Sequence, residues 1–263
     1  MRRPVWVIVG AVVVVLATAA VSGALPDPDA VDFSTILAAP SSGHVLGTDQ
    51  LGRDVAARLV AGGRLTLGIS VLTVLVTGFV GIALGLLTGY RAAAASRLLL
   101  RVVDVMAALP SVLFGLVAAA VLGPGLPSLL LAVWVVGWTP FARQAYQLTI
   151  REMAREYIEG AVSIGAGRTR VLVQHVFRNI APPLVAHGCV RFAGTMLTVS
   201  GLSFLGLGVQ PPTPEWGAMV AEGREYLFVA PHVVVVPSVA VVLVAAAASV
   251  VGRRLERHAA RAE

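Results

Sequence analysis

The chain has 263 residues, of which 57% are hydrophobic and only 13% charged, and its mean hydropathy is +0.85. An ordinary soluble domain is about 25% charged, and a soluble globule of this length could not bury so much apolar side chain, because its surface does not shrink fast enough with size. The composition therefore excludes a soluble enzyme and predicts a polytopic membrane protein.

The formal net charge is +6, and apart from histidine the basic residues are all arginine, because the chain contains no lysine. A P-loop needs a lysine to reach the terminal phosphates of ATP, so we expect any ATP energy to come from a partner. Cys189 stands alone in an apolar segment, and the five histidines show no HExxH or paired spacing. These patterns predict neither a disulfide framework nor a metal site.

Six apolar windows are candidates for membrane-spanning helices, since a bilayer core about 30 Å thick needs roughly 20 apolar residues in a helix. They are residues 5–25, 65–90, 102–122, 126–141, 182–207 and 229–251. The fourth is short, but it carries Trp134 and Trp138 and runs into a basic segment, as a span that ends at an interface does. We therefore predict an all-α fold with six transmembrane helices and both termini on one side.

The arginines indicate which side the termini occupy. With the N-terminus inside, the outer segments hold only Arg53, Arg58, Arg64 and Arg224, Arg191 lies within a span, and all other arginines are cytosolic. This bias predicts that both termini are cytosolic, and it explains the positive charge without a nucleic-acid partner. The first window also fits a cleaved signal peptide loosely, but its apolar run is long for a signal core and cleavage would break the bias.

The first polar stretch, residues 41–64, is predicted to lie outside and reads SSGHVLGTDQLGRDVAARLVAGGR. Gly47 and Gly52 flank a turn, and Asp49 or Asp54 can cap the helix that follows. The apolar residues after Asp54 predict a short amphipathic helix lying at the outer face. A solvated loop with a capped helix is the simpler alternative.

The second polar stretch, residues 151–179, is predicted to be cytosolic and reads REMAREYIEGAVSIGAGRTRVLVQHVFRN. Its periodicity predicts a short amphipathic helix that stops at Gly165-Ala166-Gly167, and a second one from about Arg168 to Val176. Such a pair exposes an apolar and acidic edge on which a partner can dock. A helix pair lying on lipid headgroups is the alternative.

The third polar stretch, residues 202–226, is again predicted to be outside. Pro211, Pro212 and Pro214 cannot continue a helix, so the fifth span is expected to end near Gly208. Trp216 fits an anchor at the membrane interface.

Three motifs in this order, HVLGTDQLGRDV, EYIEGAVSIGAGRTRVLVQHV and LSFLGLGVQPPTPEWGAM, closely resemble the dipeptide/oligopeptide/nickel permease family of ABC importers, and in particular its second, shorter permease subunit. The resemblance covers about residues 44–251 and implies the type I ABC importer permease fold. It implies a first transmembrane helix with an outer loop and amphipathic helix (1–64) and a five-helix core with a coupling loop at 151–179 (65–251). The remaining residues, 252–263, are predicted to form a basic cytosolic tail. The implied cargo is a di- or oligopeptide; nickel or another small solute is the alternative.

The same resemblance implies an assembly in the bacterial cell membrane. Its members are a second homologous permease, two ABC ATPase subunits and an extracytoplasmic solute-binding protein that delivers the peptide. ATP and Mg would be held by the ATPases, so this chain is expected to be no enzyme and to bind no cofactor.

The resemblance also implies site residues. Glu159, Ala161 and Gly165 match the glutamate–alanine–alanine–glycine loop of importer permeases, with Gly160 in place of alanine; Glu159 would contact the ATPase and Gly165 would permit the turn. The residues expected in the ATPase-coupling loop are Glu156, Tyr157, Glu159, Gly160, Ala161, Gly165 and Ala166. Those expected at the outer mouth or facing the binding protein are Asp49, Arg53, Asp54, Pro211, Pro212 and Trp216.

Arg191 and Ser203 are candidates for the translocation path. If the fifth span starts near Pro182, a rise of about 1.5 Å per residue places Arg191 some 13 Å deep, where a charge usually faces water or a partner. We hypothesise that Arg191 attracts the carboxylate of a passing peptide; a structural ion pair or snorkelling are the alternatives. Asp104 is expected to be an interfacial hydrogen-bonding residue.

Three features depart from the family pattern: Arg178 replaces a usual proline, Val199 replaces a common glutamate, and the tail is basic rather than acidic. The change at Val199 bears on the substrate path, and so on which substrate is carried.

Two other functions compete with an importer subunit. An ion-gradient-driven transporter needs buried acids near the membrane midplane, yet the centres of the spans carry almost no carboxylates. An intramembrane serine protease would need Ser203 within hydrogen-bond reach of His232, and no oxyanion donor is identifiable.

Overall fold

A computed structural model describes residues 25–90 and 93–259. Within these ranges the fold is helical, and the only β-type pairing is an isolated bridge between Thr48 and Asp54. The first predicted span, apart from Leu25, and the last four residues of the basic tail lie outside the described residues, as does the signal-peptide alternative.

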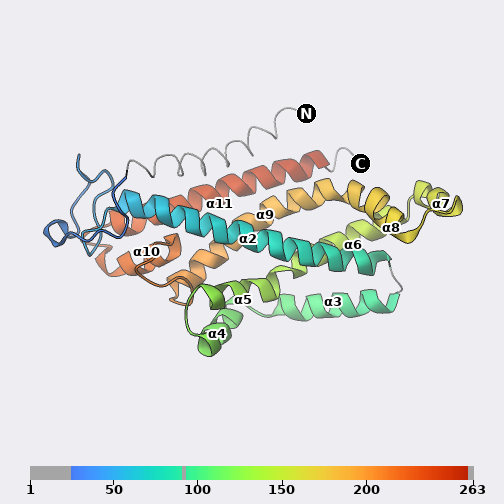
Figure 1. The fold of residues 1–263 in the computed structure, drawn as a ribbon, viewed down its shortest axis with the longest axis horizontal. Coiled ribbons are helices and arrows are strands. Elements are labelled where there is room, and N and C mark those ends of the chain that lie inside the picture. Colours follow the sequence, from blue (N-terminus) through green and yellow to red (C-terminus); the bar gives the residue numbers. More distant parts are fainter. Residues whose placement is uncertain (1–24, 91–92, 260–263) are drawn as a thin grey trace.

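The helices follow in this order: η1 (Phe33–Thr35), α2 (Val55–Tyr90), α3 (Ala93–Ala108), α4 (Ser111–Leu122), α5 (Leu126–Gly137), α6 (Thr139–Met153), α7 (Glu156–Ser163), α8 (Arg168–Arg170), η2 (Val171–Phe177), α9 (Arg178–Phe204), α10 (Trp216–Gly223), η3 (Arg224–Tyr226) and α11 (His232–Ala259). The long helices α2, α9 and α11 run along the long axis of the molecule (Figure 1). Residues 25–54 and α10 lie at one end of this axis, and α7 and α8 lie at the other. The two polar segments that the sequence placed on opposite sides of a membrane are thus at opposite ends of the bundle.

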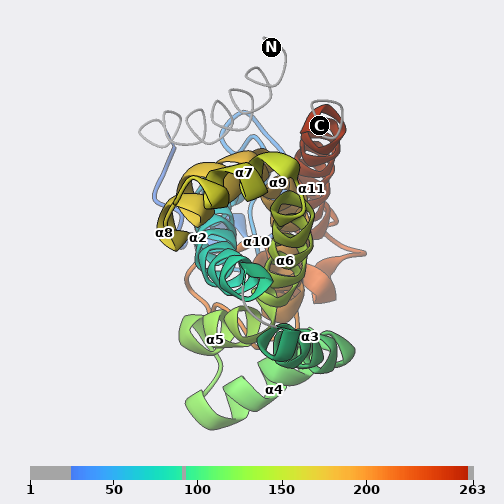
Figure 2. The same cartoon turned by 90° about the vertical axis from the view of Figure 1, so that its right-hand side faces the viewer.

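Viewed along this axis, α2, α6 and α9 lie together in the middle, with α3 and α4 at the periphery (Figure 2). Buried apolar residues join α2, α5 and α9 (Ile69, Leu129, Val199), and others join α2, α9, α10 and α11. Outward-facing positions stay apolar, and Phe79 is 77% exposed. Such an exterior suits lipid or a partner helix rather than water.

Three helices of the described chain are long and apolar enough to cross a membrane: Val55–Tyr90, Leu126–Met153 and His232–His258. A fourth span results if the pair Ser96–Ala108 and Ser111–Leu122, bent by 82°, counts as one. Of the five predicted spans that fall within the described residues, three correspond to such a helix, or four if the bent pair is counted. The window at 102–122 breaks at Pro110, because proline disfavours helical geometry in the residue before it.

The fifth predicted span lies in α9, which is 27 residues long but is not among the helices apolar enough to span. Its first half carries two prolines, His187 and Arg191, which lower its apolar character.

The predicted short helix after Asp54 does not exist as a separate element, and this expectation is wrong. Those residues form the first turns of α2, which continues unbroken to Tyr90. Gly62 and Gly63 lie inside this helix, where the lack of a side chain lets α10 pack closely against it. A Cβ atom on Gly63 would lie 2.7 Å from Cζ2 of Trp216. The predicted domain boundary at residue 64 thus falls inside one helix.

The second predicted cytosolic helix is likewise part of a longer element. Residues 168–204 are helical throughout, passing from α8 through the π-helix η2 into α9. Arg178 stands where the family usually has proline, and it keeps the backbone N–H that proline lacks. The helix can therefore continue through this position.

Candidate functional site

The loop at residues 151–179, predicted to be cytosolic, contains α7, and the end of this helix was predicted correctly. Gly165 has φ +90°, a conformation that glycine adopts without steric cost. The N–H of Gly165 donates to the carbonyl of Val162 at 3.0 Å, and the N–H of Ala166 donates to the carbonyl of Ala161 at 3.0 Å. These two bonds are the pattern that satisfies the last carbonyls of a helix before a glycine turn.

One side chain anchors α7 to the bundle. Ile158 is buried against Val171, Val176 and Ile180 of the following helix. The rest of the predicted apolar face is not buried, since Val162 is exposed, and Ile164 just after the helix is 88% exposed. The loop therefore presents apolar side chains outward.

The predicted coupling residues share this surface. Glu156, Tyr157, Glu159, Gly160 and Gly165 are exposed, and Ala161 and Ala166 are half-buried. Two carboxylates in the first turn of α7 suit the positive end of its helix dipole. The surface combines acidic and apolar groups on a helix whose position is fixed by Ile158, as a docking helix requires.

A buried carboxylate beneath this loop was missed by the sequence analysis. Glu152, in the last turn of α6, accepts hydrogen bonds from the Tyr157 hydroxyl and from Nδ2 of Asn179 at 2.8 Å, and it forms an ion pair with Nε of Arg155 at 3.2 Å. Nδ2 of Asn179 also lies 2.8 Å from the Tyr157 hydroxyl oxygen. Burial, together with the Glu152 carboxylate, raises the pKa of Tyr157.

The sequence did contain a signal for Glu152. A carboxylate in the last turn of a helix faces the negative end of the dipole, which disfavours it unless other groups compensate. Here three donors compensate, and they come from α7, α9 and the linker between α6 and α7.

At the opposite end, of the two aspartates predicted as possible caps, Asp54 is the one that caps α2. Its Oδ1 accepts from the N–H of Ala57 at 2.8 Å, and its Oδ2 lies 2.9 Å from Nδ1 of His44. Asp49 instead caps the preceding turn, since its Oδ1 accepts from the N–H groups of Leu51 and Arg53.

Two buried arginines and two acids form an ion-pair network behind this turn. Nε of Arg53 lies 2.7 Å from Asp49, and its Nη2 lies 2.8 Å from Glu222 of α10. Arg58, whose side chain is 2% exposed, lies 3.4 Å from Asp49 and 3.5 Å from Glu222. Buried charges persist only when they are paired, so the network fastens the turn at residues 49–53 and α2 to α10. The charged groups of Asp49 and Arg53 thus lie in the interior of the protein and form an ion pair with each other.

The tryptophan predicted as an interfacial anchor is buried, so that expectation is wrong. Trp216 is 5% exposed, and its Nε1 donates to the carbonyl of Leu59 at 2.8 Å. The preceding Glu215 is fully buried, caps α10 through the N–H of Ala218 at 3.0 Å, and accepts from Oγ1 of Thr66 at 2.8 Å. Long-range packing between α2 and α10 thus overrides the interfacial preference of tryptophan.

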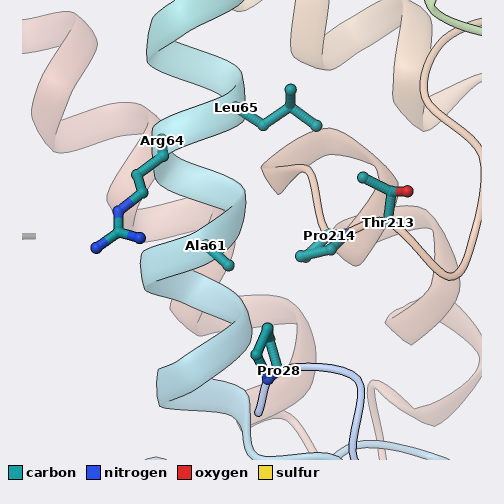
Figure 3. Close-up of a pocket in the computed structure, with 6 residues that line it drawn as sticks. All are labelled: Pro28, Ala61, Arg64, Leu65, Thr213 and Pro214. Atoms are coloured by element: carbon teal, nitrogen blue, oxygen red, sulfur yellow. The ribbon is translucent and has the colours of Figure 1, made fainter. Parts of the chain in front are cut away.

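The prolines of this region are partly exposed. Pro211 and Pro212 lie on the surface, whereas Pro214 is buried and lines an open hollow of about 430 Å³ beside α2. The hollow is also lined by Pro28, Ala61, Arg64, Leu65 and Thr213. The guanidinium of Arg64 points away from Thr213 and Pro214 (Figure 3), so the hollow itself is mainly apolar.

Arg191 lies nearer to an end of the bundle than the count from Pro182 placed it. A Cβ atom on Gly252 would meet the backbone N of Val190 at 2.7 Å, so these two residues are in close contact. Arg191 therefore lies level with the start of the basic stretch of α11, Arg253 and Arg254. It is half-buried in α9.

Ser203 and His232 do not form a catalytic pair. The Ser203 hydroxyl is buried and has no hydrogen-bond partner among the described residues. Nε2 of His232 instead lies 3.1 Å from the carbonyl oxygen of Thr48. The geometry thus removes the protease alternative. Asp104 does form a polar contact as expected, pairing with Arg143 on the surface.

Known proteins with similar sequences identify the family. The family described as binding-protein-dependent transport system inner membrane component matches residues 81–262. The chain is 38% identical to the glutathione transport system permease protein of Pectobacterium atrosepticum, over 84% of this chain and 73% of that protein. It is 39% identical to the di/tripeptide transport system permease protein of Pseudomonas aeruginosa, over 79% and 69% of the two chains. It is 34% identical to the probable D,D-dipeptide transport system permease protein of Escherichia coli K12, over 76% and 67%.

The chain belongs to the family of inner-membrane components of binding-protein-dependent transport systems, and within it to the permeases of the dipeptide and oligopeptide ABC type. It is a bacterial membrane protein and a permease component.

Proposed function

We propose that the chain is one of two permease subunits of an ATP-driven importer that carries di- or oligopeptides across the bacterial cell membrane. The named cargoes of its relatives, glutathione and dipeptides, support a peptide substrate. The observation that carries the proposal is helix α7, which is anchored to the bundle and otherwise exposed, at the end opposite residues 25–54 (Figure 1).

The proposed assembly has four kinds of partner. A second homologous permease completes the path, two ABC ATPases bind ATP and Mg, and an extracytoplasmic binding protein delivers the peptide. Both termini face the cytosol, with the chain crossing the bilayer six times. The chain itself is no enzyme in this proposal: ATP hydrolysis belongs to the ATPases, and this chain has no lysine with which to build a P-loop.

In the proposed mechanism α7 docks in a cleft of the ATPase through Glu156, Glu159 and Ile164. Closure of the ATPases on ATP moves α7, and the movement passes into the bundle, to which Ile158 anchors this helix. The permease pair then opens outward to receive peptide from the binding protein, and hydrolysis resets it. A coupling free energy of about 1–3 kcal/mol is typical for such linked sites.

The positions of the buried acidic residues favour transport driven by ATP over transport driven by an ion gradient. Asp49, Asp54 and Glu215 lie toward the outer end of the bundle, Glu152 lies beneath the coupling loop, and all four are hydrogen-bonded or ion-paired. A gradient-driven transporter instead needs titratable acids near the midplane.

The test is purification of the tagged chain from its native membrane in mild detergent, with mass spectrometry of the proteins that accompany it. We expect an ABC ATPase and a second permease. A chain that purifies alone, even after crosslinking, contradicts the proposal.

A further inference from the structure

The covalent route from α7 to α9 contains two unusual segments. The first is the turn at Gly165, whose backbone has the freedom of glycine. The second is η2, seven residues of π-helix, a form that is rare and occurs mostly at functional sites. A displacement of α7 that travelled only along the chain would have to pass through both segments before it reached α9.

A side-chain route bypasses them. Asn179 lies two residues beyond η2, in the first turn of α9, and its Nδ2 lies 2.8 Å from both Glu152 of α6 and the hydroxyl oxygen of Tyr157 of α7. The Tyr157 hydroxyl donates to the same carboxylate. The Glu152–Tyr157–Asn179 clamp thus joins three helices at one point.

Several neighbouring contacts hold the Glu152–Tyr157–Asn179 clamp in place. Glu152 is 7% exposed, and hydrogen bonds to an ionised acceptor are about twice as strong as neutral ones. The ring of Tyr157 also lies beside His175 of η2, with centroids 6.2 Å apart. Ile158, the next residue of α7, is buried in the same region. The beginning of α7 is therefore held firmly, while Ile164 beyond its other end is exposed to a partner.

We propose that the Glu152–Tyr157–Asn179 clamp transmits the movement of α7 to α6 and α9 together, without relying on the Gly165 turn or η2. Glu152 and Asn179 are positioning residues that act through Tyr157. This inference rests on the proposed role of α7 as the ATPase-docking helix.

The experiment uses the complete transporter reconstituted in liposomes, with its sister permease, its ATPases and its own purified binding protein. The measured quantity is the factor by which the binding protein, added at the outer face, stimulates ATP hydrolysis at the inner face. For Asn179→Ala we expect normal assembly and normal unstimulated hydrolysis, with stimulation reduced about fivefold or more, the lower limit of typical coupling between sites. Tyr157→Phe, which keeps the ring and removes the hydroxyl, should reduce stimulation similarly.

The matched control is Gln174→Ala. It also truncates an exposed amide, but its hydrogen bond to Arg170 at 3.2 Å stays within the segment from α8 to η2. Stimulation should remain at the wild-type level. The double variant Tyr157→Phe with Asn179→Ala should lose no more than the more damaging single variant, because both changes open the same clamp.

The outcomes separate the two proposals. Full stimulation in both clamp variants overturns the clamp and leaves the importer function standing. Loss of ATPase binding in both variants also overturns it, because the clamp would then only hold the loop in shape. A wild-type chain that neither binds an ATPase nor responds to the binding protein overturns the proposed function, and the clamp with it.

Discussion

Replacing Glu222 by glutamine should destabilise the end of the protein formed by residues 25–54 and α10 by about 3 kcal/mol. The carboxylate lies 2.8 Å from Arg53 and 3.5 Å from Arg58, whose side chains are only 3% and 2% exposed. Removing one partner of a buried ion pair costs about 3–5 kcal/mol, because the other charge stays buried. The lower figure applies here, since Asp49 still pairs with both arginines at 2.7 and 3.4 Å.

The assay is the temperature at which half of the detergent-solubilised protein leaves the monodisperse peak in size-exclusion chromatography. At roughly 2–4 °C per kcal/mol, the expected decrease is about 6–12 °C. Glu225→Gln is the matched control, because Glu225 is an exposed glutamate three residues away, and it should change stability by less than about 0.5 kcal/mol. A Glu222→Gln protein that melts within about 1 °C of wild type refutes the reasoning from the buried network.

Three further predictions concern other parts of the chain. Gly63→Ala should lower the free energy of unfolding by about 1–3 kcal/mol through overpacking against Trp216, and the same melting temperature should fall with it. Gly68→Ala should not, since a Cβ atom there meets nothing within 4 Å. Equal melting of the two variants would contradict the close packing. Glu159→Arg should leave the chain in the membrane but abolish peptide uptake and uncouple ATPase stimulation, and normal uptake in proteoliposomes would count against the docking role. Arg191→Gln should lower peptide uptake without impairing assembly if its charge faces the path; unchanged uptake and assembly would remove Arg191 from the path.

Local chemistry was readable before the fold was known. The stop of α7 at Gly165 and the cap of α2 by Asp54 were both predicted, because each depends on a few neighbouring residues and on backbone geometry. The membrane character also followed from composition. The three motifs indicated the family before any geometry was available, and the comparisons with known proteins confirm it.

Errors arose where a residue's role depends on a distant partner. A short separate helix was predicted after Asp54, but α10 packs against Gly62 and Gly63 and α2 continues to Tyr90. Trp216 had the character of an interfacial anchor, yet a carbonyl of α2 accepts its N–H in the interior. The position of Glu152 in the last turn of a helix was a signal, but its partners could not be named, because Asn179, one of them, is 27 residues away in the chain.

The sequence by itself determined that this chain is an apolar, lysine-free membrane protein with a helix that stops at Gly165 and a turn capped at Asp54, because hydropathy, charge and capping are properties of short segments. Only the tertiary structure decided which charges face inward, which helices continue and which side chains join α6, α7 and α9. Those outcomes depend on the balance between burial and pairing across helices far apart in sequence, and that balance exists only once the helices are packed together.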